Sequence, residues 1–380
     1  MLSYFKILSV LILALVCESA IAVIQSEVCS TVRLDGIGGP YHDIPLYNQR
    51  RFADHDSEIC YAVSAAQLID GARRRANPGA SLTSPISPAL AYKSRTESIS
   101  PTFPSNPNPT NIVLGGGQIY EAISWIRGKQ VCDAKFLEKY ARLTGASHSN
   151  GIASQDDKST DEFFKLLLAS VTDWKNARTQ LSSRQAMISF IACNQNLSSL
   201  SALLGVQNNN ALSNLASALD AAAAKHFSAS ETISFLSKIC KGHSHVVATP
   251  KPEILGHDRI KEQFGMQSPR ATSAELERKA NELMDSHIPK AFAISYKPEI
   301  LSGRTSASPD SYGHASIVIG RRRNPGTKNC EFLIRNSYGT DCTDPFSHRP
   351  YTSECEGGQI WVTSTLLFPN SEHIVWIPDK

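Results

Sequence analysis

The chain has 380 residues, of which 41% are hydrophobic and 19% are charged, as expected for a folded protein with one large domain or two lobes. Its net charge of +3 is too small to indicate a nucleic-acid partner. Two short arginine clusters, 73–75 and 321–323, are expected on solvated surfaces, the first of them near the end of a helix.

The first 22 residues have the pattern of a signal peptide. Lys6 precedes an apolar run over 7–16, and Ala20-Ile21-Ala22 forms a small-x-small cleavage motif. We expect cleavage near Ala22 and export to a periplasm or the medium. Lipid attachment at Cys17 is disfavoured because Val16 before it is bulky. No apolar run is long enough for a stable membrane anchor.

Eight cysteines follow the signal peptide, and an exported protein is expected to pair most of them. Cys342 and Cys355 are the preferred pair because they lie close in sequence around a Pro/Ser-rich loop. Cys193 with Cys240 is the next candidate, although the spacing alone does not determine connectivity. If Cys60 is a free thiol, at least one other cysteine lacks a partner within the chain.

The predicted elements change from helices to strands along the chain. Helices are predicted over 60–75, where apolar residues recur at helical spacing, within 84–95, and after the glycines 115–117. A mostly helical insertion is assigned to 146–272, between a helical lobe over 40–145 and a β lobe over 273–370. A capping box marks the start of a helix at 273. Four β-rich runs follow, at 290–296, 314–320, 331–337 and 359–364. This order predicts an α+β fold.

Four polar residues form a candidate catalytic set in chain order. Cys60 stands where a charged loop turns into a helix, and a helix N-terminus lowers the pKa of a thiol. His314 begins a β-run beside small residues and is a candidate general base. Asn336, which follows an apolar strand, is placed to orient an imidazole. Gln49 offers an amide that, with the Cys60 N–H, would donate to an oxyanion.

This order and its local context resemble the papain-like cysteine peptidases. The segments "ICYA", "TSPISPALAY", "GGGQIYEAISWI", "GHASIVIG" and "CEFLIRNSYGTDC" are similar to segments of that family. The resemblance implies a two-lobe fold, with a helical N-terminal lobe and an antiparallel sheet or barrel in the C-terminal lobe. It also implies that five residues line the substrate cleft, namely Gly115, Gly116, Gly117, Tyr61 and Tyr338.

The chain departs from the family pattern in several places. The Cys-Gly-Ser/Ala stretch that precedes the family's nucleophile is absent, and Gln49 lies farther upstream of Cys60 than is usual. Tyr338 stands where the family has a tryptophan. Cys60 and His314 are 254 positions apart, against roughly 130–150 in the cathepsin-like pattern. The helical insertion accounts for the excess.

The expected function is hydrolysis of peptide bonds in peptide or protein substrates through an acyl-enzyme on Cys60. A cell-wall peptide amidase, an acyl transferase of the Cys-His type and a non-catalytic binding protein on the same scaffold remain alternatives. No cofactor is expected, and no metal, because neither 54–56 nor 243–245 has a full ligand set. A monomer is expected.

Overall fold

The structure is a computed structural model. It describes residues 29–47, 59–99, 117–135, 160–204, 206, 208–223, 229–240, 242–256, 270–302, 313–338, 340, 342, 351 and 353–379. The predicted signal peptide, Gln49, Gly115 and Gly116 lie outside these residues. Among the described helices, none is both long and apolar enough to cross a membrane.

The N-terminal part of the molecule is built around one buried helix, α2. The helices here are α2 (Cys60–Ala76), α3 (Ile86–Ile99) and α4 (Ile119–Ile126). The first twelve residues of α2 are all buried, and its small side chains allow α3, α4 and the sheet to pack closely around it. The arginine cluster 73–75 occupies its last turn, where cations suit the helix dipole, as predicted.

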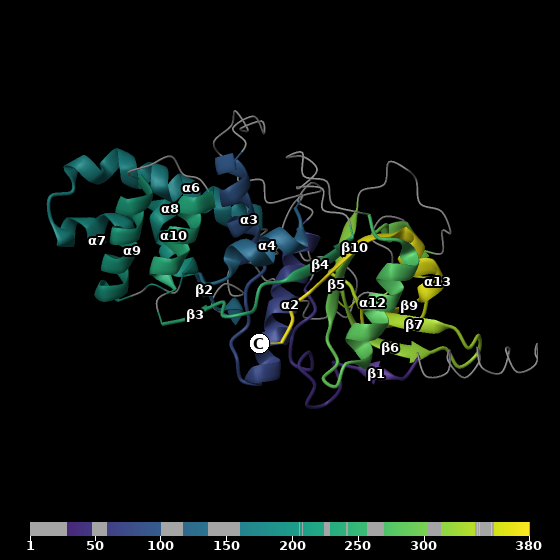
Figure 1. The fold of residues 1–380 in the computed structure, drawn as a ribbon. Coiled ribbons are helices and arrows are strands. Elements are labelled where there is room, and N and C mark those ends of the chain that lie inside the picture. Colours follow the sequence, from purple (N-terminus) through teal and green to yellow (C-terminus); the bar gives the residue numbers. More distant parts are fainter. Residues whose placement is uncertain are drawn as a thin grey trace, which may run out of the picture.

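The C-terminal part contains an antiparallel sheet, at the opposite end of the molecule from the helices of the insertion (Figure 1). The strands are β1 (Val32–Arg33), β4 (Glu253–Gly256), β5 (Phe292–Tyr296), β6 (His314–Arg323), β7 (Cys330–Arg335), β8 (Cys355–Glu356), β9 (Gln359–Thr363) and β10 (Ser371–Trp376). Their order is β4-β10-β5-β6-β7-β9-β8, and β1 pairs with β6. The four predicted strands are confirmed as β5, β6, β7 and β9. The strands β4 and β10 were not predicted.

The sheet is buried on both faces, with side chains of different size on each. Ala293 and Ala315 belong to the core that contains α2, and their small size lets the helix approach the strands closely. Phe292, Ile294 and Phe332 face the second core, which α12 (Ser273–Asp285) covers. Two short elements, α13 (Ser364–Leu367) and the 3-10 helix η4 (Phe368–Asn370), complete this side. The α+β class is confirmed.

The insertion is a group of packed helices beyond α3 and α4 (Figure 1). Its helices are α6 (Thr160–Ala177), α7 (Arg184–Cys193), α8 (Gln195–Leu203), α9 (Asn209–Ala223) and α10 (Ala229–Ile239). The chain returns through β3 (Ser244–Val246), which pairs antiparallel with β2 (Gln130–Cys132). The range 146–272 assigned to the insertion therefore also includes β4, a strand of the main sheet.

The disulfides agree with the predicted pairing in part. Cys342–Cys355 is confirmed. The candidate pair of Cys193 with Cys240 is wrong, because Cys240 pairs with Cys132 across the β2–β3 junction. Cys29 pairs with Cys330. Two described cysteines form no disulfide: Cys60, which is buried, and Cys193, which is exposed.

One arginine of the second cluster contradicts the predicted solvated surface. The side chain of Arg321 is fully buried. Its guanidinium forms an ion pair with Asp285 and donates to the Asn281 side chain at 2.8 Å. A buried cation needs such partners, and they come from α12, which lies 36 or more positions away in sequence.

Candidate active site

Cys60 is the first residue of α2. The preceding residue, Ile59, is the N-cap, and no acidic side chain lies in the first turn. The thiol therefore lies at the positive end of a 17-residue helix with no nearby carboxylate on that turn to oppose its ionisation. Cys60 is only 6% exposed.

His314 is the first residue of β6, directly opposite Tyr296 of β5. Its ring lies edge-to-face against the Tyr296 ring, with centroids 5.5 Å apart. On another side it stacks on Tyr338, with centroids 4.9 Å apart and 6° between the planes. These aromatic contacts fix the orientation of the imidazole and exclude water from it.

Asn336 follows the last residue of β7 and contacts the His314 ring. The distance from His314 Nε2 to Asn336 Oδ1 is 2.9 Å. The same oxygen accepts the Ser337 backbone N–H at 2.8 Å, so Oδ1 rather than Nδ2 faces both groups. Nε2 is therefore the donor, and the lone pair of the neutral ring is on Nδ1. This tautomer is the one in which Nδ1 accepts a proton from a thiol.

The antiparallel sheet explains why two residues 22 positions apart meet. Ile317 of β6 pairs with Arg335 of β7. One step farther along this ladder, the Ser316 hydroxyl lies 3.5 Å from Asn336 Oδ1. Because the two strands are antiparallel, the start of β6 and the end of β7 lie side by side, which brings His314 and Asn336 together.

Tyr296 connects the His314 neighbourhood with Cys60. Helix α2 packs against both β5 and β6. The pKa of the Tyr296 phenol is raised, first by burial, and the charges of Tyr351 and Cys60 act in the same direction. Because Cys60 begins α2, these packing contacts place its helix against the strands that carry Tyr296 and His314. Three of the four predicted catalytic residues are buried in this region, and the fourth, Gln49, lies outside the described residues.

Burial governs the acid–base behaviour of His314. Desolvation lowers its pKa from 6.5 to about 4, and the hydrogen bond with Asn336 acts in the opposite direction. When Cys60 is a neutral thiol, the ring is therefore neutral near pH 7. A neutral imidazole at this pH is ready to accept a proton rather than to donate one.

The predicted cleft residues Tyr61 and Gly117 contact each other. A Cβ atom on Gly117 would lie 2.5 Å from the Tyr61 ring, so only glycine leaves this ring in place. Tyr61 is 1% exposed, and its ring also packs against Tyr92, with centroids 5.2 Å apart. The structure therefore places Tyr61 behind Gly117, where its ring packs against the backbone and is not part of an open surface.

A second polar cluster was not predicted. His245 Nδ1 lies 2.6 Å from Asp133 Oδ1, and His245 Nε2 lies 3.1 Å from Thr83 Oγ1. The Thr83 backbone N–H donates to both oxygens of Asp70, at 2.9 and 2.8 Å. The arrangement has the order of a hydroxyl–imidazole–carboxylate triad, but Thr83 is fully buried, so no substrate can reach its hydroxyl. The cluster links the β2–β3 pair to α2.

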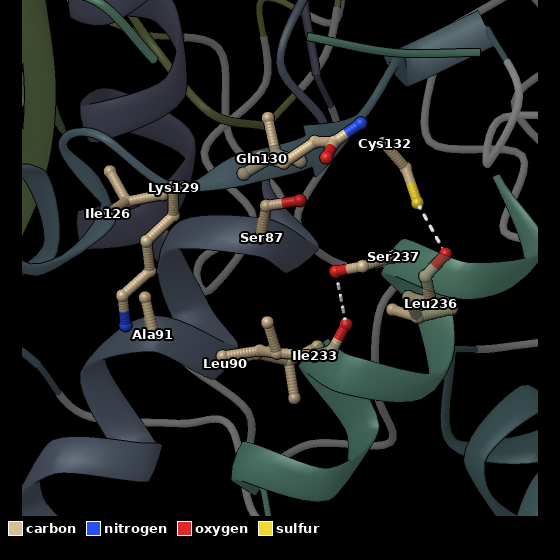
Figure 2. A pocket seen from close by; sticks show the side chains of 11 residues that line it. Ser87, Leu90, Ala91, Ile126, Lys129, Gln130, Cys132, Ile233, Leu236 and Ser237 are labelled. Atoms are coloured by element: carbon tan, nitrogen blue, oxygen red, sulfur yellow. Dashed lines mark hydrogen bonds between the residues drawn. The ribbon is translucent and has the colours of Figure 1, made fainter. Parts of the chain in front are cut away.

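A small pocket lies between the insertion and the first helices (Figure 2). It is lined by residues of α3, α10 and the segment from α4 to β2, listed as Ser87, Leu90, Ala91, Ile126, Lys129, Gln130, Val131, Cys132, Ile233, Leu236 and Ser237. Its cavity volume of about 20 Å³ has room for about one water molecule. It is therefore not a substrate site.

No family model and no curated protein matches the chain. Among solved structures, the chain is similar to bromelain protease from Ananas comosus in complex with the E64 inhibitor, at 10% identity and a TM-score of 0.39, covering 92% of this chain and 99% of that one. The proform of the Amb a 11 cysteine protease of ragweed pollen has 10% identity and a TM-score of 0.36, with 88% and 65% covered. A recombinant stem bromelain precursor has 9% identity and a TM-score of 0.36, with 94% and 73% covered. Because these values are low, we base the function on the residues of the site alone.

Proposed function

We propose that the protein is a papain-like cysteine peptidase that hydrolyses peptide bonds, with Cys60 as nucleophile, His314 as general base and acid, and Asn336 as the group that orients the imidazole. The observation that carries the proposal is the 2.9 Å contact from His314 Nε2 to Asn336 Oδ1. It leaves Nδ1 as the proton acceptor on a strand that packs against α2, the helix whose first residue is the Cys60 thiol.

The first step is transfer of the Cys60 proton to His314 Nδ1. The helix dipole favours the thiolate, whereas burial opposes the imidazolium. Two unit charges about 4 Å apart attract by about 4 kcal/mol at an effective dielectric constant of 20. That attraction corresponds to about 3 pKa units and offsets the desolvation that lowers the pKa of His314 to about 4. The ion pair is therefore accessible near neutral pH.

The remaining steps follow from this ion pair. The Cys60 sulfur attacks the carbonyl carbon of the substrate, and the oxyanion is stabilised by the Cys60 N–H and, as the sequence predicts, by Gln49. His314 then protonates the leaving amine, the C–N bond breaks, and a thioester forms. Water gives its proton to the neutral His314, attacks the thioester and releases the acid, which restores the thiol. Tyr338, stacked on His314, keeps the ring in the same plane throughout.

Export is part of the same proposal. The chain has three disulfides among its described residues and a signal-peptide pattern at its N-terminus. Disulfides persist in oxidising compartments. We therefore place the mature enzyme outside the cytoplasm. We further propose that it is a monomer that acts on peptide or protein substrates.

The test uses the chain from Val23 under mild reductant. It is incubated with denatured casein and with an epoxysuccinyl electrophile, next to Cys60→Ala and to Cys193→Ser, which removes the exposed free thiol. We expect wild type and Cys193→Ser to cleave casein and to carry the label on Cys60. Cys60→Ala is expected to do neither. A folded wild-type protein that neither cleaves casein nor takes up the electrophile would overturn the proposal.

A further inference from the structure

The side-chain amide of Asn336 is almost completely buried, with 1% of the residue exposed. Its oxygen faces the Ser337 N–H and His314 Nε2. Its nitrogen donates to the hydroxyl of Tyr351, with Nδ2 and Oη 3.2 Å apart. Both ends of the amide therefore have partners, and Tyr351 is the partner on the side away from His314.

Tyr351 lies in sequence between two cysteines that form a disulfide, Cys342 and Cys355. Its backbone N–H donates to the carbonyl of Cys342 at 3.1 Å, and Cys342 is bonded to Cys355. Tyr351 is 9% exposed and lies in the core formed by α12 and the large side chains of the sheet. The disulfide thus fixes the position of the residue whose hydroxyl contacts the Asn336 amide.

We propose that Tyr351 is a positioning residue for the catalytic pair, which holds the Asn336 amide in the orientation that His314 requires, and that the Cys342–Cys355 disulfide serves to keep Tyr351 there. This inference rests on the proposed peptidase function. An amide whose N–H loses its acceptor in a buried site is destabilised and turns toward another partner. Any such rotation moves Oδ1 away from His314 Nε2.

Loss of the Tyr351 hydroxyl is expected to destabilise the protonated form of the His314 ring. The titratable groups that contact the His314 ring are Tyr296 on β5 and Tyr338 after β7. Tyr351 acts through the Asn336 amide, and Cys60 on α2 interacts with Tyr296. Of these contacts, the bond from Nε2 to the amide oxygen raises the pKa of His314. Loss of the Tyr351 hydroxyl should therefore make the imidazolium easier to deprotonate and move the alkaline limb of activity to lower pH.

The experiment compares Tyr351→Phe, Asn336→Ala and the double variant with wild type. Tyr41→Phe is the matched control, since it removes the hydroxyl of another buried tyrosine. We expect Tyr351→Phe to lower kcat about tenfold and to shift the alkaline limb of kcat/KM downward by about half a pH unit. The reason is that the buried Asn336 N–H has then lost the Tyr351 hydroxyl as its acceptor. Asn336→Ala should cause at least as much loss, and the double variant no more than Asn336→Ala alone.

An arm without catalysis separates this inference from the proposed function. In a Cys60→Ala background, the His314 ring is titrated by NMR with and without Tyr351→Phe, and its pKa is expected to fall in the second protein. If the wild-type protein does not cleave casein but Tyr351→Phe still lowers the His314 pKa, the peptidase function is rejected and the positioning role of Tyr351 is retained. Unchanged kcat, pH profile and ring pKa in folded Tyr351→Phe would overturn it. A double variant in which the loss of kcat from Tyr351→Phe adds in full to the loss from Asn336→Ala would also overturn it.

If Tyr351→Phe does not fold, the variant with both Cys342→Ser and Cys355→Ser is expected to give the same downward shift of the His314 pKa. The absence of a shift in that variant would overturn the role of the disulfide.

Discussion

The protonation of His314 depends on whether a thiolate lies beside it, and Cys60→Ala tests this directly. Burial lowers the pKa of the ring to about 4 when no negative charge opposes it. A thiolate at a separation of about 4 Å would raise that value, by about 3 units at an effective dielectric constant of 20. The wild-type ring is therefore expected to keep its proton to a higher pH than the ring in Cys60→Ala, which loses it near pH 4.

The assay is NMR titration of the ring nitrogens in protein labelled at histidine. The chain has 11 histidines, so the His314 resonances are assigned by their absence from His314→Gln. Cys193→Ser is the control, because it removes an exposed thiol at the end of α7 and leaves Cys60 in place. Its His314 titration should match that of wild type.

The same shift has a signature in stability. In Cys60→Ala the folded ring, with its pKa of about 4, binds fewer protons between pH 4 and 6.5 than the unfolded ring. The free energy of unfolding should therefore rise with pH across this window by about 3 kcal/mol, and His314→Gln in the same background should remove the rise. A His314 pKa near 6.5 in Cys60→Ala, or equal values in Cys60→Ala and wild type, would refute the reasoning.

Three further predictions concern the surroundings of the site. Gly117→Ala places a Cβ atom 2.5 Å from the Tyr61 ring and should lower stability by about 1–3 kcal/mol in denaturant titration, with a matching loss of activity. Burial raises the pKa of Asp70 from 3.8 to about 7, so the folded state binds more protons there and stability should fall by about 4 kcal/mol from pH 4 to pH 7. Asp70→Asn should remove that dependence in pH-resolved thermal unfolding, and an unchanged curve would contradict it. Thr272→Ala removes the N-cap of α12 and should cost about 1 kcal/mol in denaturant titration with kcat unchanged, whereas a loss below about 0.3 kcal/mol would speak against the cap.

Local patterns predicted the elements that carry the site. Helix α2 follows from its apolar spacing, and the capping box of α12 follows from Thr272 and Glu275, three positions apart. The β-runs that begin at His314 and end before Asn336 were also visible in the sequence. These features depend on residues within a few positions of one another, which is the range over which sequence patterns are informative.

The sequence patterns did not predict the features that depend on residues far away in the chain. Strand β4 has four residues with a charged start, and only its pairing with β10 makes it a strand. The buried Arg321 depends on α12, and Tyr351 contacts Asn336 although the two residues are 15 positions apart in sequence. Burial of each of these groups is decided by tertiary contacts, and local sequence does not encode them.

The long interval between Cys60 and His314 is compatible with a compact site because the insertion begins and ends at one place. Cys132 and Cys240 are 108 positions apart in sequence, yet their Cα atoms lie 5.6 Å apart in the disulfide that joins them. The β2–β3 pairing and the hydrogen bond from His245 to Asp133 hold the same junction. Because the two ends of the insertion meet, it joins the flanking segments as a short loop would. The disulfide stabilises the contact between these ends. The packing of α2 on β5 and β6, which places Cys60 near His314, is made by residues on either side of that junction and does not require the helices between.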